Sequence, residues 1–198
     1  MPTVVKPRRM ATTRMLHPRE EGRYSQHVTK GTHLGRQWKP GTIAAVPGLS
    51  GITCREIETT DASALGQVMW SAFKDTVDDD EYETISDAEN EVLQTVQGKW
   101  GPLVPYGSLL ASTGQEIVSA AFVVFDQAHE FRPLLAFAVT VPEHQGKGIG
   151  GWLIENAVAH LDAAGIGELH LAVLPANPAR RLYERLGFKE VEAANGDA

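Results

Sequence analysis

Cysteine is nearly absent from this sequence, since Cys54 is the only one among 198 residues. A single cysteine excludes a disulfide within the chain, and disulfides are what small secreted domains commonly depend on. Long apolar runs are also missing: no stretch approaches the roughly 20 residues of a membrane-spanning helix, and the N-terminus lacks the apolar segment of a signal peptide. These absences favour a soluble, cytoplasmic protein without membrane association.

Acidic residues outnumber basic ones, but the charge is distributed unevenly along the chain. The whole sequence has a formal net charge of −7, whereas residues 1–50 contain nine Lys or Arg and two Glu, so this segment carries +7 and the remainder −14. The first 50 residues also lack a sustained helical or strand period. We therefore predict a basic N-terminal arm or linker without regular structure over residues 1–50, and one folded domain over residues 51–198.

Three interpretations of the basic arm are open. A clamp for nucleic acid would use its cations, but only Tyr24 and Trp38 could stack on bases. An organelle presequence is poor in acidic residues, and Glu20 with Glu21 weakens that interpretation. The favoured alternative is a solvated tail or a segment that packs on its own domain, so nucleic acid is not the expected partner.

The domain alternates strand and helix patterns, and the connections indicate how the strands pair. A turn at Thr113 and Gly114 predicts an antiparallel meander, and a short helical crossover would place the strand that follows it parallel to the last strand of the meander. The expected fold class is α/β (α+β): a mixed, mostly antiparallel sheet with one parallel strand pair, flanked by helices. Predicted strands cover residues 52–57, 108–112, 117–125, 134–141, 169–173 and 188–192; predicted helices follow Asp61, begin at a capping box of Ser86 and Glu89, cover residues 152–164, and begin at Asn177 with Pro178 in the first position.

Four glycines fall within six positions in the turn before the helix at 152–164. Backbone N–H groups at a helix start lack intrahelical acceptors, and the helix dipole adds to their attraction for an anion. Glycine lets phosphate oxygens approach the backbone, so the turn predicts a diphosphate site; the alternative is a merely flexible turn. The segment consists of Gln145, Gly146, Lys147, Gly148, Ile149, Gly150 and Gly151.

Gly146, Gly148 and Gly151 also match the G-x-G-x-x-G pattern of dinucleotide-binding folds. Such folds place an acidic residue at the end of the next strand, whereas Glu168 lies at the start of that strand here. The turn also lacks the Lys-Ser or Lys-Thr pair of a nucleoside triphosphate site. A nucleotide-dependent function is therefore disfavoured.

With these residues the chain resembles the GNAT superfamily of N-acyltransferases, whose signature is matched by Gln145, Gly148 and Gly150. The similarity continues from Asn177 to Phe188, in Asn-Pro-Ala-Arg-Arg-Leu-Tyr-Glu-Arg-Leu-Gly-Phe, and the order of predicted elements agrees. The resemblance implies a GNAT-like fold and an N-acetyltransferase. Such an enzyme moves an acetyl group from acetyl-coenzyme A to an amine of a small molecule or peptide, by direct attack on the thioester in a ternary complex. It implies no metal.

The resemblance also assigns expected roles to single residues. Tyr183 would act as general acid toward the leaving thiolate, although packing alone could explain it. The turn would hold the coenzyme A diphosphate, and the strand before it would pair with the pantetheine arm. Asn177 would cap its helix and contact the cofactor. The expected cofactor-binding set is Ala138, Val139, Thr140, Gln145, Gly146, Lys147, Gly148, Ile149, Gly150, Gly151 and Asn177.

The chain departs from the family pattern in three places. Asn177 and Ala179 are one residue closer together than is usual. Ala172 stands where some relatives carry a glutamate base, which leaves His170 and Glu168 as candidates only. The chain leaves little room for the family's final strand, so a bare sheet edge would result unless the N-terminal arm or a second subunit covered it, which would favour a homodimer.

Acidic residues crowd the segment between the first two predicted helices, a region that lines the acceptor side in the resembling family. Carboxylates would attract a cationic amine, and the alternative is a solvated loop. Two other functions stay open: a module that binds coenzyme A without turnover, and a nucleic-acid-associated protein that uses its basic arm. The acidic residues are Asp78, Asp79, Asp80, Glu81 and Glu83.

Overall fold

The computed structural model describes residues 31–74, 82–127 and 130–192. They form a seven-stranded sheet in the order β2-β3-β4-β5-β6-β1-β7, in which every pairing is antiparallel except that of β5 with β6. The predicted fold class is confirmed. The strands are β1 (Thr32–Gln37), β2 (Thr53–Glu56), β3 (Leu109–Thr113), β4 (Glu116–Asp126), β5 (Arg132–Thr140), β6 (Glu168–Val173) and β7 (Lys189–Glu190).

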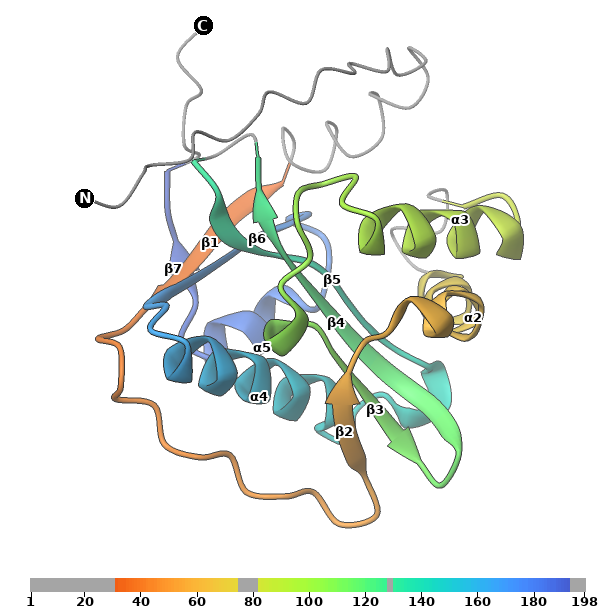
Figure 1. The fold of residues 1–198 in the computed structure, drawn as a ribbon, viewed down its shortest axis with the longest axis horizontal. Helices are drawn as coiled ribbons and strands as arrows, with labels where there is room; N and C mark the ends of the chain where they lie inside the picture. The colour runs from red at the N-terminus through yellow and green to blue at the C-terminus, as the bar shows by residue number, and fades with distance from the viewer. Residues whose placement is uncertain (1–30, 75–81, 128–129, 193–198) are drawn as a thin grey trace, which may run out of the picture.

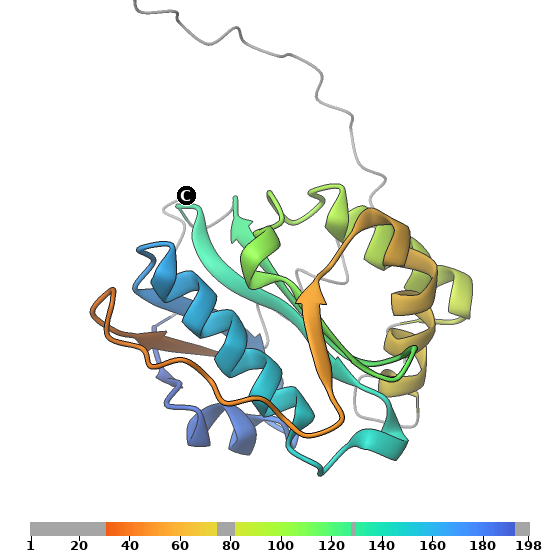
Figure 2. The ribbon, with the colours of Figure 1, turned by 60° about the horizontal axis from the view of Figure 1, so that its bottom comes forward.

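Helices cover both faces of the central strand β4, which explains why its residues from Val118 to Val124 are all buried. One face of the sheet packs against α4, and the other packs against α2, which in turn packs on α3 (Figures 1 and 2). The α-helices are α2 (Ala62–Phe73), α3 (Ile85–Val96), α4 (Ile149–Ala163) and α5 (Arg180–Arg185); the 3-10 turns are η1 (Thr59–Asp61), η3 (Pro105–Gly107) and η4 (Pro142–His144).

The sequence predicted no strand before Gly51, and this prediction was wrong for Thr32–Gln37. This segment forms β1, which lies between β6 and β7 and pairs antiparallel with both. Leu34 is only 1% exposed and belongs to the core. Of the two ways in which the bare sheet edge could be covered, the structure shows the first: the N-terminal segment pairs with β6 and β7.

After β1 the chain runs along α4 toward β2 (Figure 1). Near the C-terminal end of α4, the buried Asp162 carboxylate accepts the backbone N–H groups of Gly41 at 2.7 Å and Ile43 at 3.1 Å. Near the N-terminal end, the Trp152 indole donates to the Pro47 carbonyl at 2.8 Å. This connection is therefore fixed to α4 at both ends of the helix.

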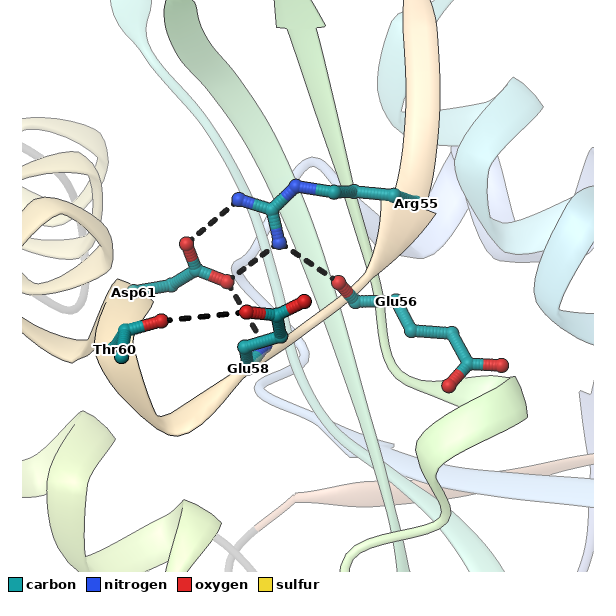
Figure 3. A network of polar contacts seen from close by, with 5 residues as sticks. All are labelled: Arg55, Glu56, Glu58, Thr60 and Asp61. Carbon is teal, nitrogen blue, oxygen red and sulfur yellow. Dashed lines mark hydrogen bonds and ion pairs between the residues drawn. The ribbon is translucent and has the colours of Figure 1, made fainter.

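Polar side chains fix the N-terminal ends of helices α2 and α3, which pack against each other. Arg55 of β2 forms a bidentate pair with Asp61, with both N–O distances 2.7 Å, and the same carboxylate accepts the N–H of Glu58 (Figure 3). The capping box of α3 consists of Thr84 and Asp87, so the prediction of Ser86 and Glu89 was wrong by two residues. Both pairs have the required spacing, and the sequence pattern could not choose between them.

Candidate active site

The glycine-rich turn connects the end of β5 to the start of α4. Gln145 folds back, and its side-chain amide donates to the Thr140 carbonyl at 2.9 Å. Gly148 is the N-cap of α4 with φ of 84°, a left-handed conformation that glycine adopts without strain. The helix thus begins three residues earlier than predicted, and its first backbone N–H groups come from the glycine segment itself.

The glycines of the turn meet two different spatial requirements. A side chain at Gly150 would place its Cβ 3.1 Å from the Thr140 hydroxyl, and one at Gly151 would lie 3.1 Å from Leu182 of α5. Nothing lies within 4 Å of the corresponding position at Gly146 or Gly148. Two glycines therefore let α4 approach its neighbours, and two border open space, as an anion site requires.

β5 and β6 pair only briefly before β5 continues toward the turn. Their parallel register is Leu134 with His170, while β5 extends to Thr140. The pairing of β5 with β4 shifts register between Phe137 and Leu135, so Ala136 is an extra residue in a β-bulge. Such bulges re-aim backbone groups and are common beside active sites, yet nothing in the sequence pattern indicated this one.

A buried serine supports the end of β5. Ser119 of β4 is 1% exposed; its hydroxyl donates to the Val139 carbonyl at 2.8 Å and lies 2.9 Å from the Thr140 hydroxyl. Because these bonds fix the strand segment next to the turn, Ser119 is a positioning residue that the sequence alone did not indicate.

Tyr183 lies on α5, 8% exposed, with its ring edge-to-face on Phe188 at 6.0 Å between centroids. Its helix packs on the start of α4, where Leu182 contacts Gly151. The side-chain oxygen of Asn177 accepts the N–H of Ala179 at 2.8 Å. Asn177 was predicted as the N-cap, but α5 begins at Arg180 with Ala179 as N-cap, so Asn177 caps the turn that precedes the helix.

The structure thus brings the end of β5, the glycine turn and α5 into one neighbourhood. Ile149 is 3% exposed, so its side chain belongs to the core and only its backbone could serve a ligand. Lys147 is exposed beside the turn. The acidic residues 78–81 of the expected acceptor loop lie outside the described residues, and Glu83 is exposed just before α3.

Glu168 and His170 were candidate bases, and the structure pairs them with each other. The Nε2 atom of His170 lies 3.0 Å from the Glu168 carboxylate, which also accepts a longer bond of 3.4 Å from Gln37 of β1. Partial burial opposes ionisation of Glu168, but the bonds from His170 and Gln37 outweigh it and hold the pKa of this carboxyl below its usual range. Glu168 is therefore an anion beside the imidazole at neutral pH.

Other chemistries find less support in the described part of the chain. Burial raises the pKa of the Cys54 thiol, which disfavours the thiolate that a cysteine nucleophile needs. Within the described ranges, no group of three or more His, Cys, Asp or Glu side chains is arranged to hold a metal ion. No helix of the described residues is long and apolar enough to cross a membrane.

Comparison with known proteins shows which family a large part of this chain is similar to. Residues 106–190 match the model of the family described as "Acetyltransferase (GNAT) domain". The fold is similar to that of a GCN5-related N-acetyltransferase from Sphaerobacter thermophilus, with a TM-score of 0.59 and 18% identity over 81% of this chain and 48% of that one. Residues 106–190 are therefore similar to a GNAT acetyltransferase domain, and the comparisons agree with the resemblance stated from the sequence.

Two further relatives are named for the same activity. A [ribosomal protein bS18]-alanine N-acetyltransferase of Haemophilus influenzae is 40% identical over 52 residues, which are 26% of this chain and 36% of that protein. The ribosomal-protein-S18-alanine N-acetyltransferase of Escherichia coli has a TM-score of 0.55 and 23% identity, over 71% of this chain and 79% of that one. The chain thus spans about a third of the matched curated relative and about half of the Sphaerobacter chain.

Proposed function

We propose that this protein transfers an acetyl group from acetyl-coenzyme A to a primary amine. The observation that carries the proposal is the open glycine turn at the start of α4, which follows the part of β5 that is no longer paired with β6. The turn supplies backbone N–H groups for a diphosphate. The freed edge of β5 at Ala138, Val139 and Thr140 supplies backbone groups with which a pantetheine arm pairs as an added strand.

The proposed reaction is direct attack of the amine on the thioester carbonyl. A backbone N–H of β5 near the bulge at Ala136 stabilises the oxyanion that develops on the carbonyl oxygen. When the C–S bond breaks, the departing thiolate takes a proton from Tyr183. Gln145 and Ser119 hold the turn and the strand end in place, and no metal takes part in this scheme.

The proposed acceptor is an amine of a peptide or small molecule. The two relatives named for acetylation of an alanine in ribosomal protein S18 suggest a peptide N-terminus as the first candidate. The acidic composition of residues 78–83 suggests a cationic acceptor such as a lysine side chain or a polyamine. All three are primary amines that are mostly protonated at neutral pH.

The test is a thiol-release assay with acetyl-coenzyme A and three amines: a peptide with N-terminal alanine, a lysine peptide blocked at its N-terminus, and spermidine. Release that depends on the amine, with mass spectrometry of the acetylated product, is the expected result. Acetyl-coenzyme A binding in calorimetry without release for any amine would replace the enzyme by a binding module. No binding at all would contradict both.

A further inference from the structure

The N-terminal strand β1 forms one half of a polar surface whose other half is β6. Alternate residues of a strand share a face, and the register places His33 opposite Ala172, Gly35 opposite His170, and Gln37 opposite Glu168. This surface borders a recess at the base of β5. The recess is lined by His33, Leu34, Asp126, Arg132, Leu134, His170, Leu171, Ala172, Val191 and Glu192.

His170 occupies a defined place in this recess. It is the residue of β6 that pairs with Leu134 before β5 leaves the parallel register, so it stands at the point where a thioester laid along β5 would end. Its Nε2 atom is 3.0 Å from the Glu168 carboxylate. Because that ionised carboxylate can only accept, Nε2 carries the proton and Nδ1 carries the lone pair.

Gly35 of β1 determines the space around that lone pair. A Cβ at Gly35 would lie 3.0 Å from the Nδ1 atom of His170 and 3.1 Å from its Cε1 atom. Such contacts are tighter than normal packing, so a side chain would crowd Nδ1 or move the ring. The imidazole therefore depends on two residues of the N-terminal segment: Gly35 leaves room beside Nδ1, and Gln37 bonds the carboxylate that orients Nε2.

We propose that His170 is the general base that removes the proton of the acceptor ammonium, and that β1 builds the wall of the acceptor recess beside it. The inference rests on the proposed acetyltransferase function and deepens it. The ammonium gives one proton to Nδ1 of His170, which passes it to solvent, and the free amine then forms the C–N bond. The amine nitrogen loses a second proton as the amide forms, which balances the one that Tyr183 gives to the thiolate.

The charges around His170 suit a cationic acceptor. Two carboxylates line the recess, Asp126 on β4 and Glu192 after β7, and the Glu168 carboxylate on β6 bonds His170. Arg132 on β5 and His33 on β1 also line it, and Lys189 of β7 pairs with Gly35. With two carboxylates and one guanidinium in its lining and the Glu168 carboxylate bonded to His170, the recess attracts an ammonium before it is deprotonated.

The decisive experiment is the pH dependence of kcat/KM for the full chain with its best amine. The wild type should lose activity as the pH falls, because a protonated imidazole cannot accept the proton of the ammonium. His170→Gln should lower kcat/KM about 10²- to 10⁴-fold at neutral pH and should recover only as pH approaches the ionisation of the amine itself. Glu168→Gln should lower it less and displace the acidic limb. Acetyl-coenzyme A binding should be unchanged in both.

Gly35→Ala tests the contribution of β1, with Gly48→Ala as its matched control. Gly48 lies in the same N-terminal segment, and nothing is within 4 Å of its Cβ position. Gly35→Ala should lower kcat about tenfold or more with an intact fold, whereas Gly48→Ala should not. An active wild type whose pH profile is unchanged by His170→Gln and Glu168→Gln would overturn this inference alone. A wild type inactive with every amine would overturn the proposed function as well.

Discussion

At the scale of single residues, Gly148 and Gly165 form a matched pair at opposite ends of α4. Both have left-handed φ values, 84° and 81°, and neither has an atom within 4 Å of its Cβ position. Gly148→Glu should abolish acetyl-coenzyme A binding in calorimetry, because it places a carboxylate in the space proposed for the diphosphate. Gly165→Glu carries the same backbone strain and charge but should bind normally. Equal affinities in the two variants would move the cofactor site elsewhere.

Tyr183→Phe should lower kcat by roughly 10- to 10⁴-fold with little change in coenzyme A affinity, since it removes a proton donor and preserves the ring. The edge-to-face contact with Phe188 should survive, so the melting temperature should also be nearly unchanged. Tyr106→Phe, outside the proposed site, is the control for loss of a phenol. Full turnover of Tyr183→Phe, where chemistry limits the rate, would leave Tyr183 with a packing role only.

Single residues were predictable from the sequence where the requirement is local. The glycine turn could be recognised because its conformation and its helix start are set within seven neighbouring positions. The pairing of Glu168 with His170 needs only strand alternation, and both were named as candidates. The role of Gly35 could not be foreseen, because the ring that fills the space above it lies on another strand, far along the chain.

At the scale of elements, the Arg55–Asp61 pair joins β2 to the start of α2. The hydrogen bond from Arg55 outweighs partial burial and, with the N–H of Glu58, holds the pKa of the Asp61 carboxyl below its usual range. A carboxyl whose pKa is lower in the folded state than in the unfolded state stabilises the fold. This stabilisation is complete at pH values above the ordinary pKa of 3.8, and it is lost as the pH falls through the lower pKa of the folded state.

We therefore expect Asp61→Asn to lower the free energy of unfolding at pH 7 by about 1–2 kcal/mol, as measured by urea denaturation, since Arg55 is half-exposed and the pair is partly screened. The difference from wild type should shrink as pH falls below about 4. Glu56→Gln, an exposed carboxylate on the same strand, is the control. A deficit that stays constant into acid would assign the effect to packing.

Sequence patterns predict that a helix or strand exists better than they predict the residues at which it begins and ends. The strands β3, β4 and β5 and the crossover to β6 were predicted, because period and turn residues are local. The start of α4 was placed too late, because glycines are poor helix formers and only the contacts of Gly150 and Gly151 explain their place in its first turn. The start of α5 was predicted too early, at Asn177, because an asparagine side chain can cap the turn before a helix as well as the helix itself.

At the scale of the whole molecule, β1 makes the N-terminal segment part of the domain. A chain that begins at residue 31 keeps β1 and serves as the reference for this test. A chain that begins at residue 39 lacks Leu34 and leaves β6 and β7 without the strand between them, so it should be unfolded or aggregated. Circular dichroism and size-exclusion chromatography can compare the two. Equal stability would mean that the sheet does not need β1.

Strand β1 was not predicted from the sequence, because the prediction for this segment relied on its composition. The first 50 residues are basic and rich in turn formers, and β1 is a short run whose glycine, Gly35, weakens its strand signal. Its burial comes from contacts with β6 and α4, including an ion pair of 2.8 Å between Arg36 and Glu155. The resemblance gave the place of the missing strand, but only long-range pairing identifies the segment that fills it.

The position of β1 also determines when this protein can fold during its synthesis. Gln37 and its partner Glu168 are separated by 131 residues, so β1 leaves the ribosome long before the strand with which it pairs. Until β6 and β7 are available, Leu34 of β1 stays exposed and both edges of the strand stay unpaired, so that other chains can bind them. Such long loop closure is slow. We therefore expect the sheet to be completed only once β6 and β7 have left the ribosome, and pulse proteolysis of stalled chains can measure this.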